Sequence, residues 1–160
     1  DMLEGATPES RAARDVIDQW WAIKLGIPDF TPRMALQQFG TEVMRNSFHD
    51  DMWILSLQRK LELAEPSANI VVTDVRFPNE IAMIKELGGT CIRVKRGENP
   101  DWWDLAVSSN KVGMFEAIED LGIHESEYRW IGQEFDHEIT NDGSFIDLQI
   151  KVNDLVSNCV

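Results

Sequence analysis

The sequence has few cysteines and little positive charge, and each shortage disfavours a class of protein. Cys91 and Cys159 are the two cysteines. They give neither a disulfide framework nor the spacing of a zinc site, and they suggest a reducing compartment. No apolar run is long enough to span a membrane and no signal peptide is visible, which favours a cytoplasmic protein without a membrane partner. The formal net charge is -13, and such an acidic surface is repelled by the nucleic-acid backbone.

Apolar and aromatic residues are abundant enough for a single folded domain over residues 1–160. Hydrophobic residues make up 43% of the chain, with six tryptophans and seven phenylalanines, which is typical of a globular protein. Amphipathic periodicity predicts a helical segment over residues 7–65, with helices at 7–25, 31–45 and 52–63. Trp20 and Trp21 fall on the apolar face of the first helix, so we expect them in the core.

The stretch 69–80, N-I-V-V-T-D-V-R-F-P-N-E, is the centre of the predicted fold. Its apolar, β-branched run over 70–73 is bounded by turn residues, which predicts a buried strand that is parallel to its neighbour. A helix from Pro78 to Leu87 and a strand over 90–95 would complete a βαβ unit.

The C-terminal part of the sequence predicts one more strand and one more helix. The strand is expected over 135–140, and a capping box of Ser144 and Asp147 starts a helix that runs to about Ser157. The sheet core would therefore consist of residues 69–96 and 135–158, with an insert at 97–134. Alternating strands and helices indicate an α/β fold with a parallel sheet.

Two pairs of polar residues lie where a ligand could bind, and each pair has a structural alternative. Asp74 and Arg76 follow the predicted strand, where open α/β sheets place their ligands. Asp74 could hold a metal-bound water and Arg76 could fork onto phosphate; alternatively, Asp74 caps the next helix and Arg76 pairs with a surface carboxylate. Arg33 and Gln37 share a helix face, and an arginine and a glutamine placed in this way could bind a phosphate and a base. Alternatively, the two residues belong to a solvated face without a ligand.

Four stretches carry a resemblance to a known family: T-P-R-M-A-L-Q-Q-F-G-T-E-V, I-V-V-T-D-V-R-F-P-N-E, L-G-G-T-C-I-R-V-K-R-G and H-E-I-T-N-D-G-S-F-I-D-L. In this order they resemble parts of the phage deoxynucleoside monophosphate kinases, in the nucleoside-monophosphate-kinase branch of P-loop proteins. The resemblance spans about Thr31 to Val156. It implies a three-layer, parallel-sheet, P-loop-kinase-like core with a helical nucleotide-binding segment and a lid-like insert.

The resemblance also implies roles for individual residues. The residues that would hold the deoxynucleotide are Arg33, Gln37 and Arg45, with base specificity from Gln38 or Asn79. The catalytic residues that would face Mg²⁺ and the transferred phosphoryl group are Asp74 and Arg76. The lid candidates are His124, Ser126, Glu127 and Arg129. The implied reaction transfers a phosphoryl group from ATP to a deoxynucleoside monophosphate, and its catalysis is mostly positioning and charge stabilisation.

One feature of that family is missing from the sequence. The family begins with a strand, a Gly-rich loop ending in Gly-Lys-Ser/Thr and a helix, whereas none of the ten glycines here is followed by lysine. That loop cradles the ATP phosphates. We therefore expect a core truncated at its N-terminus that transfers phosphoryl only if a further segment or another chain supplies the loop.

A second hypothesis is a catalytically inactive acidic phage protein on a kinase-derived scaffold. Its surface would bind and inhibit a host or defence protein in the host cytoplasm, as a mimic of DNA. A homodimer is a further alternative that the sequence leaves open.

Overall fold

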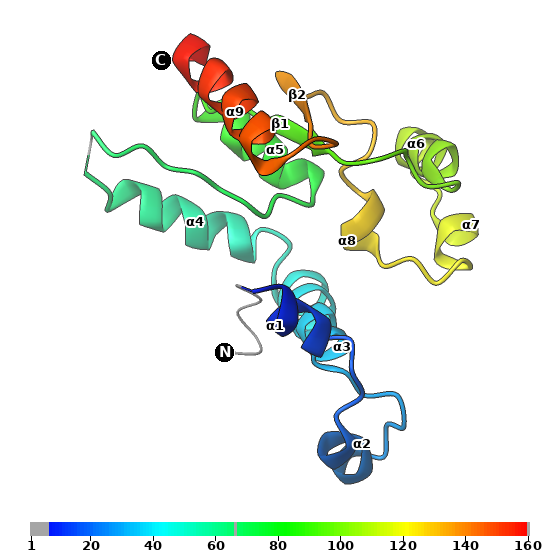
Figure 1. The fold of residues 1–160 in the computed structure, drawn as a ribbon. Coiled ribbons are helices and arrows are strands. Elements are labelled where there is room, and N and C mark those ends of the chain that lie inside the picture. The colour runs from blue at the N-terminus through cyan, green and yellow to red at the C-terminus, as the bar shows by residue number, and fades with distance from the viewer. Residues whose placement is uncertain (1–6, 66, 160) are drawn as a thin grey trace. The chain divides into compact units, whose positions relative to one another are not determined.

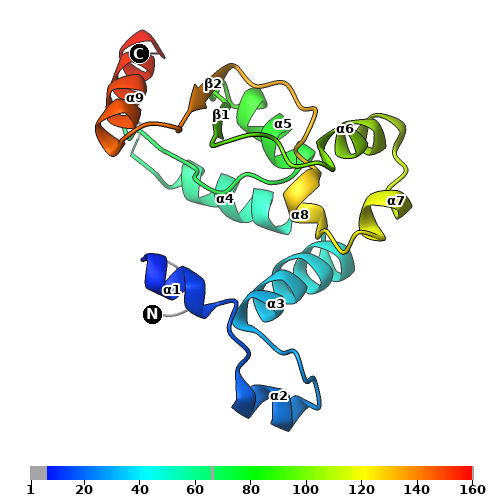
Figure 2. The same ribbon diagram turned by 45° about the vertical axis from the view of Figure 1, so that its right-hand side comes forward.

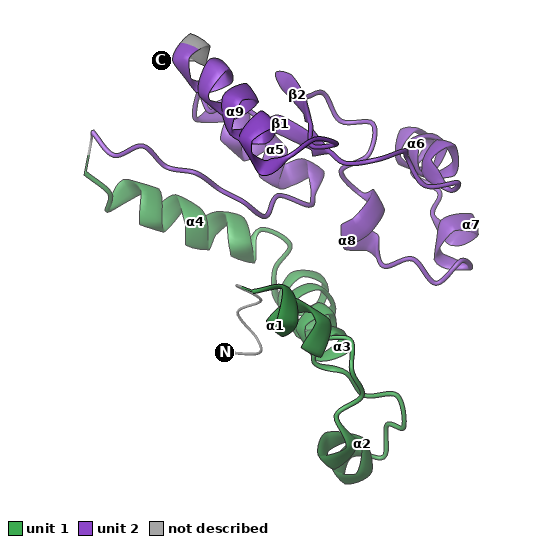
Figure 3. Cartoon of the chain, viewed as in Figure 1, with its two compact units in different colours: residues 1–65 green, residues 66–160 purple. Residues whose placement is uncertain are grey.

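The computed structural model describes residues 7–65 and 67–159 (Figure 1). The chain divides into two compact units, residues 1–65 and 66–160, shown in Figure 3, and each is described by itself. No helix among the described residues is long and apolar enough to cross a membrane.

Unit 1 is helical, as predicted, but its first helix is broken in two. The helices are α1 (Pro8–Ala13), α2 (Gln19–Leu25), α3 (Pro32–Gln37), the π-helix η1 (Gln38–Phe48) and α4 (Met52–Glu62). A continuous helix over 7–25 is therefore wrong. The Asp18 carboxylate accepts a hydrogen bond from Trp21 N at 3.1 Å, and Asp18 N donates to Phe30 O at 2.9 Å. Because Asp18 caps a new helix instead of continuing the old one, the chain turns before α2.

The predicted helix over 31–45 is present, but its second half is wider than an α-helix. Thr31 caps α3 by accepting from Met34 N at 3.1 Å, and the chain passes into η1 at Gln38. His49 N bonds to Met44 O, five residues back, at 3.0 Å. The Trp53 indole N–H donates to Gly40 O at 2.9 Å, which ties η1 to the first turn of α4. Hydrogen bonds that reach five residues back, instead of four, are those of a π-helix.

The expectation that Trp20 and Trp21 lie in the core is wrong. The two residues are 59% and 46% exposed, and their rings meet edge to face with centroids 4.7 Å apart. Trp21 also lies 6.3 Å from the ring of Phe30. The helix α2 is only seven residues long, and Ala22 is its buried residue. The two tryptophan rings therefore pack against each other and against Phe30 instead of entering a core.

The described residues of unit 2 form a small parallel sheet and five helices. Its elements are α5 (Pro78–Glu86), β1 (Ile92–Lys95), α6 (Trp103–Val112), α7 (Glu116–Glu119), α8 (Glu125–Tyr128), β2 (His137–Thr140) and α9 (Phe145–Cys159). Both strands and the helices α5 and α9 were predicted. Figure 2 shows β1 and β2 side by side. In their parallel register, Ile92 is opposite His137 and Lys95 is opposite Thr140.

The predicted central strand over 69–73 is wrong in this structure. Residues 69–73 form neither strand nor bridge, and Val71 is 83% exposed. Within residues 67–159, β1 pairs in parallel with β2 instead. A β-branched run is stable as a strand only when its backbone groups find a neighbour, and the sequence pattern does not supply one. The structure thus supports a mixed α/β chain with a two-stranded parallel sheet, and a three-layer core stays a prediction.

The insert over 97–134 folds around a core of its own. Ala106, Ile118, Tyr128 and Ile131 are each at most 1% exposed and form one cluster. The Asn110 amide donates to Tyr128 O at 2.7 Å and to Ile131 O at 2.8 Å, which fastens the end of α8 to α6. This core fixes the position of α8 and of the side chains that it carries.

Candidate functional site

Arg76 is the centre of an ion-pair cluster in unit 2. Its Nε donates to Asp74 Oδ1 at 2.7 Å, and an Nη donates to Glu127 Oε1 at 3.0 Å. The Arg76 side chain is 43% exposed, so the guanidinium lies at the surface between its two carboxylates. Asp74 and Arg76 belong to one sequence motif, whereas Glu127 comes from α8 in the insert. The fold therefore joins two stretches that are 51 residues apart.

The backbone of Arg76 is held by a residue that the sequence analysis did not single out. Glu80 Oε2 accepts hydrogen bonds from Arg76 N at 2.7 Å and from Phe77 N at 3.1 Å. Phe77 is 8% exposed and anchors the start of α5 in the core. The signal was available, because a glutamate at the third position of a helix commonly reaches back to the N-cap backbone. Glu80 thus fixes the backbone conformation at Arg76, and with it the direction in which the Arg76 side chain points.

The electrostatics of the cluster keep Arg76 cationic. Partial burial alone would lower the pKa of its guanidinium, but the hydrogen bond to Asp74 and the charges of Glu127 and Asp74 outweigh it, so that the pKa is raised. A permanently charged fork with paired donors suits a phosphate or carboxylate. The cluster matches the structural alternative for Arg76, a pair with surface carboxylates, but Asp74 does not cap α5, whose N-cap is Phe77.

The other lid candidates surround Glu127 on α8. His124 Nδ1 lies 2.8 Å from Ser126 Oγ and 3.3 Å from Ser126 N, which makes His124 the cap of this short helix. The Arg129 guanidinium lies over the Phe115 ring, 4.4 Å from its centroid. Arg129 Nε is buried without a hydrogen-bond partner in the part of the chain that the structure describes. Glu127 is the lid candidate whose ion pair reaches Arg76.

The nucleotide-binding candidates of unit 1 do not form one cluster. Arg33 forms a bidentate ion pair with Asp15, and its Nη lies 3.1 Å from Asp15 Oδ2. That bond and the positive charge lower the pKa of Asp15. Arg45 is 3% exposed and donates to Asp50 O at 3.0 Å and to Asp50 Oδ1 at 3.3 Å. Arg45 therefore joins η1 to the turn before α4, as a structural ion pair does.

The three amide candidates have different surroundings. Gln37 is half-buried at the end of α3, and Gln38 is exposed at the start of η1. Asn79 is half-buried in the first turn of α5, and its Oδ1 accepts from Glu80 N at 3.1 Å. Arg33, Gln37, Gln38 and Arg45 lie in unit 1, whereas Asp74, Arg76 and Asn79 lie in unit 2. The structure brings Asp74, Arg76 and Glu127 together and defines no distance between the two sets.

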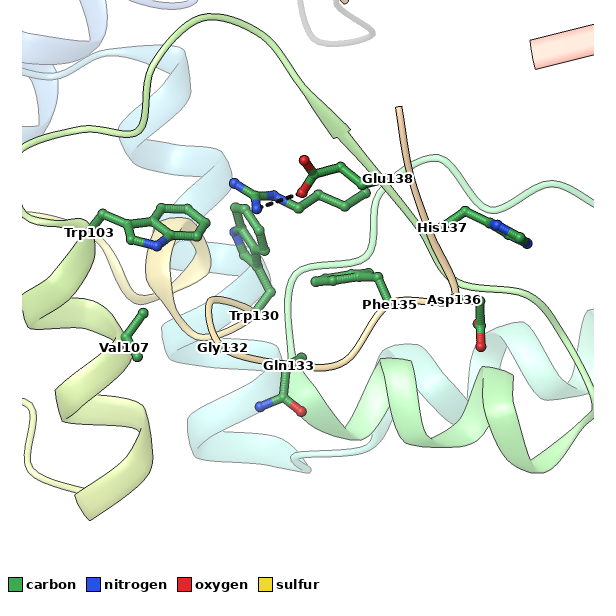
Figure 4. Close-up of a pocket in the computed structure, with 10 residues that line it drawn as sticks. Trp103, Val107, Trp130, Gly132, Gln133, Phe135, Asp136, His137 and Glu138 are labelled. Atoms are coloured by element: carbon green, nitrogen blue, oxygen red, sulfur yellow. Dashed lines mark hydrogen bonds and ion pairs between the residues drawn. The ribbon is translucent and has the colours of Figure 1, made fainter. Parts of the chain in front are cut away.

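A second feature of unit 2 is a cavity of about 360 Å³, drawn in Figure 4. Its walls include Arg93, Trp103, Trp130, Phe135, Asp136 and Glu138. They come from β1, the start of α6, the loop after α8 and the start of β2. Sequence reasoning missed this cavity because it looked for ligands beyond the carboxyl ends of strands. The tryptophans near both ends of the insert were the available signal.

Within the described residues, no group of three or more His, Cys, Asp or Glu side chains could hold a metal ion. A metal bound here would need ligands from the substrate or from water. Asp74 and Glu127 are the carboxylates nearest to the Arg76 guanidinium.

Comparison with known proteins gives concordant matches. A family model described as "Deoxynucleotide monophosphate kinase" matches residues 8–109. A "Putative deoxynucleotide monophosphate kinase" of Acanthamoeba polyphaga mimivirus is 33% identical over 104 residues, which cover 56% of this chain and 47% of that protein. The "Deoxynucleoside-5'-monophosphate kinase" of Escherichia phage T5 is 39% identical over 56 residues, which cover 35% of this chain and 22% of that protein. The matches thus span less than half the length of these relatives, and no solved structure matches the chain.

Proposed function

Because the chain belongs to the deoxynucleotide monophosphate kinase family, we propose that it binds a deoxynucleoside 5'-monophosphate and that Arg76 is the principal ligand of its phosphate. The observation that carries this proposal is the Arg76 cluster. Arg76 keeps its charge, its backbone is fixed by Glu80, and its donors lie at the surface on carboxylates that an anion can replace.

Phosphate binding would exchange one anion for another on the same guanidinium. Arg76 has five N–H donors in a planar fork, and Asp74 and Glu127 occupy some of them. The pair with Glu127 is solvent-exposed, and exposed pairs contribute only about 0.2–1 kcal/mol. A doubly charged phosphate forms stronger, bidentate bonds with arginine. The nucleotide would therefore displace Glu127 and keep Asp74 as the group that orients Arg76.

In unit 1, taken by itself, we propose Arg33, Gln37 and Gln38 as nucleotide-binding groups, as the family resemblance implies. Arg33 is paired with an exposed carboxylate, Asp15, in the same manner as Arg76 with Glu127. A phosphate or a ribose hydroxyl can compete for such a pair. Gln37 and Gln38 carry amide groups that can both donate to and accept from a base. Arg45 would act indirectly, because its ion pair with Asp50 keeps η1 in place.

Phosphoryl transfer from ATP is the reaction that the family implies, with Mg²⁺ as the metal. Asp74 fits a magnesium ion that is held mainly by water and nucleotide phosphates, because one or two carboxylates suffice for such a site. The bound ion would neutralise charge on the phosphates. Asp74 would orient the Arg76 guanidinium, and Arg76 would hold the acceptor phosphate in line and balance the charge that develops there.

The donor side of the reaction would come from groups other than these. No Gly-Lys pair, which the family's phosphate-binding loop contains, occurs in the sequence. We therefore propose that this chain carries the acceptor half of the site. ATP-dependent turnover would need a phosphate-binding loop from a further segment or from another chain.

The experiment that tests this proposal is calorimetry with the four deoxynucleoside monophosphates, without ATP, on the wild-type chain and on Arg76→Ala. We expect at least one nucleotide to bind, and Arg76→Ala to weaken it by about 1.5–3 kcal/mol, the contribution of a charged hydrogen bond. Arg96→Ala is the matched control, because it removes an exposed arginine of the same unit. The absence of both heat and thermal stabilisation with all four nucleotides would overturn the proposal.

A further inference from the structure

We propose that the cavity between β1, α6 and β2 binds the neutral, amino-bearing base of a nucleoside. This inference rests on the proposed function only for the choice of a nucleoside as the ligand. The residues that line the cavity all lie in unit 2. The cavity is separate from the ion pairs of Arg76, which are made with Asp74 and Glu127.

Three aromatic residues line the cavity: Trp103, Trp130 and Phe135. The Trp103 and Trp130 rings meet edge to face with centroids 5.6 Å apart, and Trp130 meets Phe135 in the same way at 6.1 Å. Figure 4 shows the Trp103 ring beside the Trp130 ring, with Phe135 next to them. Flat apolar surfaces of this kind stack with planar rings of any base. The volume of about 360 Å³ falls within the range of small-molecule sites.

The charges around the rings restrict what can enter. The Arg93 guanidinium already lies over Trp103, 4.4 Å from the ring centroid, and over Trp130 at 5.7 Å. A second cation would be repelled by it. Two acidic residues, Asp136 and Glu138, line the same cavity, so a phosphate would also be repelled. A neutral planar ligand remains.

The carboxylates also indicate which neutral ligand binds best. Glu138 Oε2 accepts from Arg93 at 2.8 Å, and Asp136 Oδ2 accepts from Cys91 N at 2.7 Å. A carboxylate can accept about four hydrogen bonds, so each keeps acceptor capacity for an N–H donor. Adenine, guanine and cytosine carry an exocyclic amino group, whereas thymine presents a carbonyl oxygen at that position. The site should therefore prefer deoxyadenosine to thymidine.

The backbone fixes the groups that make this selection. Arg93 and Glu138 are opposite each other in the parallel register, so their side chains leave the same face of the sheet. The Arg93 side chain is 18% exposed and also donates to Asn99 Oδ1 at 3.0 Å. These bonds hold the guanidinium plane over the tryptophans before any ligand arrives, which lowers the entropic cost of binding.

The test is fluorine NMR of the 160-residue chain labelled with fluorotryptophan and titrated with deoxyadenosine, which carries no phosphate. The resonances are assigned by single Trp→Phe substitutions. We expect the Trp103 and Trp130 resonances to shift along one saturation curve, while the resonance of Trp20 in unit 1 stays in place. Thymidine should bind more weakly. The same shifts should occur in Arg76→Ala, which separates this site from the phosphate site.

A substitution measures the contribution of the ring itself. Trp103→Leu should weaken deoxyadenosine binding about 5- to 150-fold, the range that stacking on an aromatic side chain contributes. If Trp103→Leu does not fold, the titration of the wild-type chain with deoxyadenosine and thymidine still tests whether the cavity binds a base. No saturable shift, equal shifts at Trp20, or thymidine binding as tight as that of deoxyadenosine would overturn the proposal.

Discussion

Replacing Glu127 by glutamine should increase the affinity for a deoxynucleoside monophosphate. In the nucleotide-free protein, Glu127 Oε1 lies 3.0 Å from Arg76 and competes for the donors that a phosphate would use. Glutamine keeps the size of the side chain and removes its charge. The competing ion pair is lost, while the bond from Arg76 to Asp74 remains.

The size of the effect follows from the exposure of the pair. The Arg76 and Glu127 side chains are 43% and 48% exposed, so solvent screens their attraction. Pairs of this kind are worth about 0.2–1 kcal/mol. Since the nucleotide no longer has to break the pair, its dissociation constant should fall about 1.4- to 5-fold.

Calorimetry at low salt is the assay, because screening reduces the difference as ionic strength rises. Glu116→Gln is the matched control: it removes an equal charge from an exposed position on α7, and no ion pair of Glu116 is found among the described residues. Glu116→Gln should leave the affinity nearly unchanged. Equal or weaker binding by Glu127→Gln would refute the idea that phosphate and Glu127 compete for Arg76.

Three further predictions follow from the same structure. Asn110→Ala should lower the free energy of unfolding in urea by about 1–3 kcal/mol, because two backbone carbonyls of the insert lose their donor. Asn153→Ala, on an exposed face of α9, is the control and should change the free energy of unfolding little. Equal effects of the two substitutions would contradict this prediction. Tyr128 is the single tyrosine, and burial, with the charges of Glu119 and Glu125, raises its pKa from 10.0 to about 12. The tyrosinate absorbance of the folded chain should therefore have its titration midpoint near pH 12. Because tyrosine in the unfolded chain ionises near pH 10, up to roughly 3 kcal/mol of the folding stability that is present below pH 10 should be lost as the pH rises to 12. A midpoint near 10 in the folded chain would exclude a buried phenol. Finally, a coupled assay of the 160-residue chain alone should detect no ATP-dependent kinase turnover, and ordinary turnover would show that another segment replaces the phosphate-binding loop.

Local signals in the sequence predicted the ends of several elements. Ser144 N donates to Asp147 Oδ2 at 2.8 Å and Asp147 N to Ser144 Oγ at 3.3 Å, as a capping box requires. Pro78 begins α5, as predicted. These features depend on residues within a few positions of each other, so their physical cause is contained in the sequence pattern.

Long-range partners were beyond sequence reasoning. The run over 70–73 has the composition of a buried strand, yet β1 pairs with β2 instead, because pairing depends on which neighbour the fold supplies. The contact between Arg76 and Glu127 bridges 51 residues and has no periodic signal. The resemblance to a family named both residues as candidates without indicating that they touch. The resemblance itself agrees with the family match over residues 8–109.

The most direct test of the account observes the Arg76 guanidinium itself. In a nitrogen–proton NMR spectrum of the arginine side chains, the Arg76 Nε–H resonance is assigned by its loss in Arg76→Lys and is then followed during titration with deoxyadenosine monophosphate and with deoxyadenosine. We expect the monophosphate to shift this resonance in a saturable manner and the nucleoside to leave it unchanged, because the guanidinium recognises phosphate. Saturable binding of the monophosphate to the chain with the Arg76 resonance unmoved would contradict the central claim.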